Sequence, residues 1–188
     1  MDFISVMETV IQRLDAAGVR YALIGGFAMA LRGVQRATLD LDFILMLEDR
    51  EYADRIFRQS GYTLAFRNEN VSHYFSDSPE MGRIDLIHAF RRRSLTMLER
   101  AERIPLGASL SLPVVRVEDL IGLKVQAARN DPAREQSDWL DIRLLAEAAR
   151  DQGTSLDWDL ISDYLYLFDQ SAQLSVLKSW YGTPDPHR

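Results

Sequence analysis

The segment TLDLDFILML, residues 38–47, constrains the fold more than any other part of the chain. Its run of apolar residues predicts a buried strand, in which successive side chains point to opposite faces of a sheet. Leu41, Phe43 and Leu45 would form an apolar face, whereas Asp40 and Asp42 would begin the other face. Neither strand propensity nor solubility requires two acids at these positions. This pair is therefore the first candidate for a functional site.

A third acid suggests what the pair would do. Two carboxylates two residues apart on a strand lie about 6–7 Å from each other. At an effective dielectric constant of about 20, their repulsion is about 2 kcal/mol, which a bound divalent cation would turn into attraction. Asp85 is the lone acid of the apolar strand GRIDLIHAF, residues 82–90, and a neighbouring strand could bring it beside Asp40 and Asp42. Three such acids can hold two metal ions for phosphoryl transfer.

The ligand type predicts the metal. Carboxylate oxygens without a His or Cys close in the sequence suit Mg²⁺ or Mn²⁺ rather than zinc. The alternative is that each acid is a solvated residue at a strand end or turn. That interpretation is adequate for Asp40 or Asp42 taken alone, and it is weaker for two acids on one face together with Asp85 and an upstream glycine turn.

Gly25 and Gly26 lie where a predicted strand, residues 20–24, passes into a short helix that ends near Gly33. Glycines at such a position let a phosphate approach backbone N–H groups, although glycine pairs after strands are also ordinary turns. The segment GGFAMALRG has neither the spacing of a dinucleotide-binding turn nor the Gly-Lys-Ser/Thr of a P-loop. A haloacid-dehalogenase-type phosphatase does not fit either, because its apolar run precedes the Asp-x-Asp acids, whereas FILML follows them here.

The order of predicted elements divides the chain of 188 residues, which is long enough to bury one sizeable core. Apolar spacing and glycine stops predict further helices and strands. The helices are expected at 3–18, 48–61, 118–130 and 134–153, with two more after 154, and the remaining strands at 62–66, 72–76 and 110–116. We therefore predict an α/β or α+β core with a mixed sheet, residues 1–116, and a helical region, residues 117–188, packed on it.

Composition excludes several classes of protein. The absence of cysteine rules out disulfides and thiolate metal sites. The N-terminus lacks the basic and apolar regions of a signal peptide, and the longest uncharged apolar stretch is too short to span a membrane, so we expect a cytoplasmic protein without a membrane partner. A net charge of −6 argues against indiscriminate nucleic-acid binding. The arginine-rich segment 91–103 is either a solvated helix face or a phosphate-contact patch.

Taken together, these motifs resemble the nucleotidyltransferase superfamily of DNA polymerase β. More narrowly, they resemble the AbiEii type of bacterial nucleotidyltransferase, found in abortive-infection and toxin–antitoxin systems. The resemblance spans residues 21 to about 146, and its strand and turn elements are matched by Gly25, Gly26, Arg36, Thr38, Asp40, Asp42 and Asp85. A downstream Lys-then-Asp element is matched by Lys124 with Asp138 or Asp141. Val117 departs from the pattern, because many relatives have a Ser or Thr helix cap there.

The resemblance implies a role for each matched residue. Asp40 and Asp42 would hold Mg²⁺ on the triphosphate, and Asp85 would complete the second metal site and help to deprotonate the acceptor. Gly25 and Gly26 would cradle phosphates. Lys124 would neutralise triphosphate charge, or else extend to solvent as an ordinary helix lysine.

The remaining matched residues have more than one interpretation. Arg36 and Thr38 would orient phosphates or brace the loop. Asp138 could orient Lys124 or the acceptor, whereas Asp141 is expected on a solvated helix face. His73 and His88 are expected to be structural.

The function that follows is transfer of a nucleoside monophosphate from an NTP to a hydroxyl or phosphate acceptor by two-metal catalysis. The acceptors implied by the resemblance are RNA or tRNA, protein and small molecules, and the triple arginine 91–93 favours RNA. The resemblance also implies a toxin role with an antitoxin protein as partner. The alternative is a catalytically inactive module of the same fold that binds nucleotide or a protein partner. Three intact acids argue against the alternative.

Overall fold

The structure is a computed structural model that describes residues 3–35, 38, 40–78, 81–107 and 110–182. Its residues divide into two compact units. The first comprises residues 1–28 and 36–115, and the second comprises residues 29–35 and 116–188. The division of the chain into two domains at residue 116 stays a prediction.

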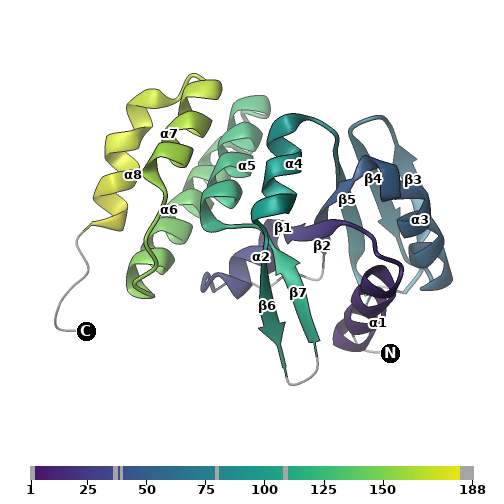
Figure 1. The fold of residues 1–188 in the computed structure, drawn as a ribbon. Coiled ribbons are helices and arrows are strands. Elements are labelled where there is room, and N and C mark those ends of the chain that lie inside the picture. Colours follow the sequence, from purple (N-terminus) through teal and green to yellow (C-terminus); the bar gives the residue numbers. More distant parts are fainter. Residues whose placement is uncertain (1–2, 36–37, 39, 79–80, 108–109, 183–188) are drawn as a thin grey trace. The chain divides into compact units, whose positions relative to one another are not determined.

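The first unit contains a mixed seven-stranded sheet with the order β3-β4-β5-β2-β1-β7-β6 (Figure 1). The strands are β1 (Tyr21–Ile24), β2 (Leu41–Met46), β3 (Thr63–Arg67), β4 (Val71–Phe75), β5 (Arg83–Ala89), β6 (Glu102–Leu106) and β7 (Leu110–Val114). The pairs β2–β5 and β1–β7 are parallel, and the other neighbours are antiparallel. The predicted mixed sheet with flanking helices is confirmed.

Helices of the first unit pack on this sheet through apolar faces. They are α1 (Phe3–Ala16), α3 (Arg50–Gln59) and α4 (Arg92–Arg100). The unit also contains the start of α2 (Gly25–Leu31) and the 3-10 turn η1 (Leu47–Asp49). Helix α1 contacts α3 and β7, and α4 contacts β2 and β5. In the sheet, Leu41, Phe43 and Leu45 are fully buried, as the strand pattern predicted. Tyr21 packs edge-on against Phe43 with ring centroids 5.6 Å apart.

Strand β4 is anchored to α3 by Tyr74. Its ring is 1% exposed and packs edge-on against Phe57 with centroids 5.1 Å apart. Its hydroxyl donates to Asp54 Oδ1 at 2.9 Å. The Arg67 guanidinium donates both to the Tyr74 hydroxyl, at 2.8 Å, and to Asp54 Oδ1, at 2.7 Å. Neighbours of Tyr74 in β4 are thereby held at a fixed position on the opposite face of the sheet.

One strand was not predicted from the sequence, and another begins later than predicted. The segment 102–106 forms β6. It was not predicted as a strand, because its charged residues and Pro105 lower the local strand signal. It pairs only with β7, at one end of the sheet order, where a proline without an N–H is tolerated. Strand β2 begins at Leu41 rather than at residue 38, so Asp40 precedes the strand.

The second unit is helical, with α5 (Val117–Asn130), α6 (Glu135–Asp151), α7 (Trp158–Leu167), the 3-10 turn η3 (Ser171–Gln173) and α8 (Leu174–Tyr181). The expected helical region after residue 117 is confirmed. Gly122 of α5 lets Tyr164 pack closely, because a Cβ at that position would come 2.6 Å from the ring. The Tyr164 hydroxyl donates to the buried Asp119 at 2.7 Å. None of the described helices has the length and apolar composition that crossing a bilayer requires.

Candidate active site

Asp42 and Asp85 lie side by side on one face of the sheet. In the parallel ladder between β2 and β5, Asp42 is the direct partner of Asp85. Adjacent strands are about 4.8 Å apart, and paired residues share a face. The residues on either side, such as Leu41 and Phe43, point to the opposite, buried face. Both acids are partly exposed. The predicted proximity of Asp42 and Asp85 is therefore present in the sheet.

Gly25 makes room for the Asp42 carboxylate. Ile24, the last residue of β1, pairs with Asp42, and the chain then turns at Gly25 with φ +65°. A Cβ on Gly25 would overlap the Asp42 side chain and come 2.7 Å from its Cβ. The left-handed φ and the lack of space both require glycine at this position. Gly26 follows as the second residue of α2.

Asp40 is engaged by an arginine that the sequence analysis did not consider. Arg83 donates to Asp40 Oδ2 through its guanidinium at 3.0 Å and to Oδ1 through its backbone N–H at 3.2 Å. The hydrogen bond to Asp40 raises the pKa of Arg83, and the charges of Asp40, Asp85 and Asp42 raise it further. Thr38 Oγ1 accepts a hydrogen bond from the Asp40 N–H at 3.1 Å, and its role in orienting phosphates or bracing the loop stays a prediction. Arg36 lies outside the described residues.

His73 contacts Asp85 directly. The two residues are partners in the antiparallel ladder between β4 and β5, and His73 Nδ1 lies 2.7 Å from Asp85 Oδ1. His88 has a different environment: it is 2% exposed and lies between the Ser72 hydroxyl, at 2.9 Å, and the Glu69 carbonyl, at 3.0 Å. His88 is structural as expected, whereas His73 belongs to the acidic site. Nothing in the sequence pattern signals this, because the contact depends on strand register.

The acidic site fits a divalent cation by ligand type, but the three acids are not preassembled around one. Among the described residues, no three or more His, Cys, Asp and Glu side chains gather as a metal-binding group. Asp42 and Asp85 offer adjacent hard oxygen ligands, which suit Mg²⁺ or Mn²⁺. The Asp40 carboxylate holds Arg83 instead. The convergence of Asp40, Asp42 and Asp85 on shared metal ions stays a prediction.

Lys124 lies in the second unit, between two buried acids of α6. Its Nζ is 2.9 Å from Asp138 Oδ1 and 2.6 Å from Asp141 Oδ2. Asp138 is 1% exposed and Asp141 5%, so the expectation of a solvated Asp141 was wrong, because the helix turns both acids inward to the same lysine. Lys124 is itself largely buried and does not extend to solvent. Asp138 Oδ2 is buried and has no hydrogen-bond partner in the described part of the chain.

The arginine-rich segment forms α4 and the start of β6. Arg91, Arg92 and Arg93 are exposed around the N-terminus of α4, and the Arg91 guanidinium lies 5.1 Å from the centre of the Phe90 ring. Arg103 is not part of this surface, because it donates to Ser111 Oγ at 3.1 Å within the β6–β7 hairpin. A solvated helix face describes the three exposed arginines. Phosphate contact by them stays a prediction.

A mixed sheet with a glycine turn after β1 and an acid pair on β2 and β5 is typical of the nucleotidyltransferase class of proteins. The chain belongs to the family described as "Nucleotidyl transferase of unknown function (DUF2204)", whose model matches residues 4–180. The predicted superfamily is thereby confirmed. The narrower AbiEii resemblance is not among the findings and stays a prediction. No curated protein sequence matches the chain significantly.

Solved structures share the fold. The antibiotic-resistance factor ANT(2″)-Ia aligns with a TM-score of 0.64 at 17% identity, covering 95% of this chain and 97% of that one. An antigenic nucleotidyltransferase-like protein from Paracoccidioides brasiliensis gives 0.57 at 18% identity, with coverages of 97% and 94%. A putative nucleotidyltransferase from Thermotoga maritima gives 0.57 at 16% identity, with coverages of 74% and 92%. At these identities the likeness concerns the fold alone.

Proposed function

We propose that the protein transfers a nucleoside monophosphate from an NTP to a hydroxyl or phosphate acceptor. The observation that carries the proposal is the pairing of Asp42 with Asp85 on one sheet face beside the Gly25 turn. In the reaction, an acceptor oxygen forms a bond to the α-phosphorus, the bond from that phosphorus to the bridging oxygen breaks, and pyrophosphate leaves. Bound Mg²⁺ or Mn²⁺ would neutralise the charge that develops on the phosphate oxygens.

The chain's own residues would supply the remaining steps. Asp42 and Asp40 would hold the metal ions. For this, Asp40 would release the Arg83 guanidinium and bind a metal ion in its place. Asp85 would act as a ligand and accept the proton of the acceptor hydroxyl. Gly25 and Gly26 would allow the triphosphate to approach the backbone closely. In the second unit, Lys124 would offer positive charge to the triphosphate, held in place by Asp138. Arg36 would contribute a phosphate contact.

The acceptor class is open to three proposals: RNA such as a tRNA end, protein hydroxyls, and small molecules. The exposed arginines 91–93 support RNA. One relative by fold has been solved in complex with adenylyl-2″-tobramycin, which supports a small-molecule hydroxyl. The AbiEii resemblance supports a toxin role, with an antitoxin protein as partner. Expression of this chain alone should then arrest growth, whereas its Asp42→Asn variant should not. Co-expression of the neighbouring gene tests that role, because an antitoxin would relieve the arrest.

Label transfer tests the proposed reaction. The protein is incubated with each of the four α-³²P-labelled NTPs, Mg²⁺ or Mn²⁺, and either total RNA, an aminoglycoside mixture or the protein alone. Metal-dependent transfer from one or more NTPs is expected, and Asp42→Asn should abolish it while the melting temperature is unchanged or raised. Loss of folding in Asp42→Asn would show that this acid is structural, and the absence of both transfer and NTP-dependent Mn²⁺ binding would refute the proposal.

A second candidate function is an inactive module that binds nucleotide or a protein partner. The Arg83–Asp40 pair favours it, because that contact occupies one of the three acids with a resident cation. The same assay separates the candidates. An inactive module would bind labelled NTP without transferring the label to any of the acceptors.

A further inference from the structure

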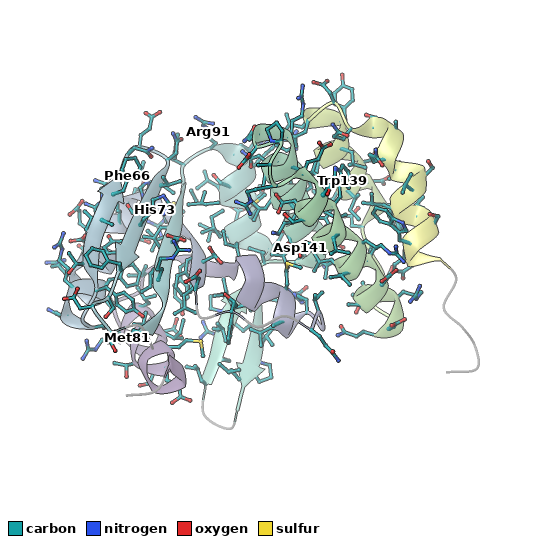
Figure 2. The ribbon with its side chains drawn as sticks, turned by 180° about the vertical axis from the view of Figure 1, so that it is seen from behind. Phe66, His73, Met81, Arg91, Trp139 and Asp141 are labelled. Carbon is teal, nitrogen blue, oxygen red and sulfur yellow. The ribbon has the colours of Figure 1, made fainter. Side chains whose placement is uncertain are left out.

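Four side chains from four strands form one row on the face of the sheet that carries the acid pair. Asp42 of β2 pairs with Asp85 of β5, Asp85 pairs with His73 of β4, and His73 pairs with Phe66 of β3. Paired residues in neighbouring strands share a face. The row therefore runs from the acids to the β3 end of the sheet order, and Figure 2 shows Phe66 and His73 next to each other there.

The hydrogen bond between His73 and Asp85 makes the two carboxylate oxygens of Asp85 different from each other. An ionised carboxylate only accepts hydrogen bonds, so His73 Nδ1 must carry the hydrogen that it donates to Oδ1 across 2.7 Å. This contact engages Oδ1 and restricts rotation of the carboxylate. This hydrogen bond also opposes the tendency of Asp85 to turn away from the neighbouring charge of Asp42.

Phe66 holds the imidazole ring in turn. The two rings stack with centroids 5.7 Å apart and an interplanar angle of 24°. A register irregularity between Leu64 and Phe66 interrupts the β3–β4 ladder just before the stacked pair. Such irregularities re-aim side chains. Phe66 is 51% exposed, and its ring stacks on the histidine at the surface of the sheet. On the other face of β4, Tyr74 anchors the strand to α3.

We propose that His73 is a positioning residue for Asp85, oriented by the Phe66 ring, and that it presents the Asp85 carboxylate to the metal ions and the acceptor. This inference rests on the proposed nucleotidyl transfer and adds a histidine and a phenylalanine to it. A residue that orients a metal ligand acts on metal affinity and on turnover, whereas a residue that only fills space acts on stability. Loss of an orienting partner typically lowers metal affinity or activity 10- to 100-fold.

Variants that keep or remove the donor at Nδ1 test the proposal. Asn places an amide N–H near the position of the imidazole Nδ1, so His73→Asn should retain the contact, whereas His73→Leu should lose it. The readouts are Mn²⁺ affinity from electron paramagnetic resonance, kcat and KM for the NTP, and the melting temperature. We expect His73→Leu to weaken Mn²⁺ binding and kcat at least about 10-fold with little change in KM, and His73→Asn to restore both.

The Phe66 ring is tested in the same way. Phe66→Leu should produce a smaller effect in the same direction. Tyr52→Leu is the matched control, because Tyr52 is a similarly exposed aromatic residue, 53% exposed, on α3. It should leave Mn²⁺ affinity and kcat unchanged.

Asp85→Asn separates failure of this inference from failure of the proposed function. If Asp85→Asn leaves Mn²⁺ binding and transfer unchanged, the acid site itself is refuted. If Asp85→Asn abolishes both but His73→Leu leaves Mn²⁺ affinity and kcat intact, only the role of His73 is refuted. A fall in melting temperature that is equal in His73→Leu and His73→Asn, without rescue of kcat, would also overturn the proposal, because it would show a structural role.

Discussion

Gly25 and Asp42 are packed so closely that any side chain at residue 25 would overlap the Asp42 carboxylate. Two separate requirements meet at this glycine, a left-handed φ of +65° and the absence of a Cβ. The left-handed φ is common among glycines and affects only the stability of the fold. The absence of a Cβ affects the position of the Asp42 carboxylate and therefore the acid pair. A comparison of two glycine substitutions therefore separates the two requirements.

Gly25→Ala is expected to lower Mn²⁺ affinity about 10-fold or more, because the methyl group must displace Asp42 from its position beside Asp85. Gly18→Ala is the control. Gly18 has a similar φ of +68°, and nothing lies within 4 Å of the added Cβ. Both variants should lose about 1–2 kcal/mol of stability from the left-handed conformation. Equal Mn²⁺ affinities in the two variants would show that the Gly25–Asp42 contact has no part in metal binding.

Arg83→Met is expected to tighten Mn²⁺ binding several-fold. The substitution removes a positive charge that lies 3.0 Å from Asp40 Oδ2 and competes with a cation for that oxygen. Titration of Mn²⁺ by electron paramagnetic resonance measures the change. Arg20→Met is the control, because Arg20 also pairs with acids, Asp49 and Glu48, but outside the acidic site. Weaker binding in Arg83→Met would contradict the assignment of Asp40 as a ligand.

Lys124→Met is expected to destabilise the protein by about 3–5 kcal/mol, because it removes the largely buried cation that both Asp138 and Asp141 contact. Arg134 is 3.5 Å from Asp138 Oδ1, but its side chain is more exposed and more distant than that of Lys124. Thermal or denaturant unfolding measures the loss. Replacing both acids by asparagine in the Lys124→Met background should recover part of the stability, since no uncompensated charge remains buried. Full stability of Lys124→Met would show that water reaches the two carboxylates and that the cluster is not a buried ion network.

Stability should fall below about pH 6.5 because of His88. Burial lowers the pKa of His88 from its ordinary value of 6.5, and the charges of Arg50 and Arg67 lower it further. The unfolded chain binds a proton near pH 6.5, whereas the folded chain binds it only at lower pH. The contribution of His88 is therefore fully present above pH 6.5 and is lost as pH falls through the folded pKa.

The measurement is the melting temperature at pH 7.5 and at pH 5.5, for the wild type and for His88→Gln. A smaller fall in the variant is expected, because glutamine does not titrate. The other titrating groups are common to both proteins, so the difference between the two falls isolates His88. Identical falls would mean that His88 has the same pKa in the folded and unfolded chains.

Local patterns were enough to predict the elements around the site. The apolar alternation of residues 38–47 predicted a buried strand, and its acids stood out because nothing local requires them. Gly25 and Gly26 were also recognised from the local sequence, because they lie where a predicted strand passes into a helix. Strand β6 was missed because Pro105 and its charges lower the local strand signal, and only its pairing with β7 makes it a strand.

By itself, the sequence determined the superfamily, most of the helices and strands in their order, and the identity of the acids as unusual residues in apolar strands. Short-range periodicity carries that information, because side chains in a strand or helix repeat at fixed intervals. The tertiary structure alone decided which side chains meet. Arg83 beside Asp40, His73 beside Asp85 and Lys124 between two buried acids are contacts that depend on strand register and helix packing. A shift of one residue in register would turn each strand's side chains to the other face and remove the row of side chains that runs from Asp42 to Phe66.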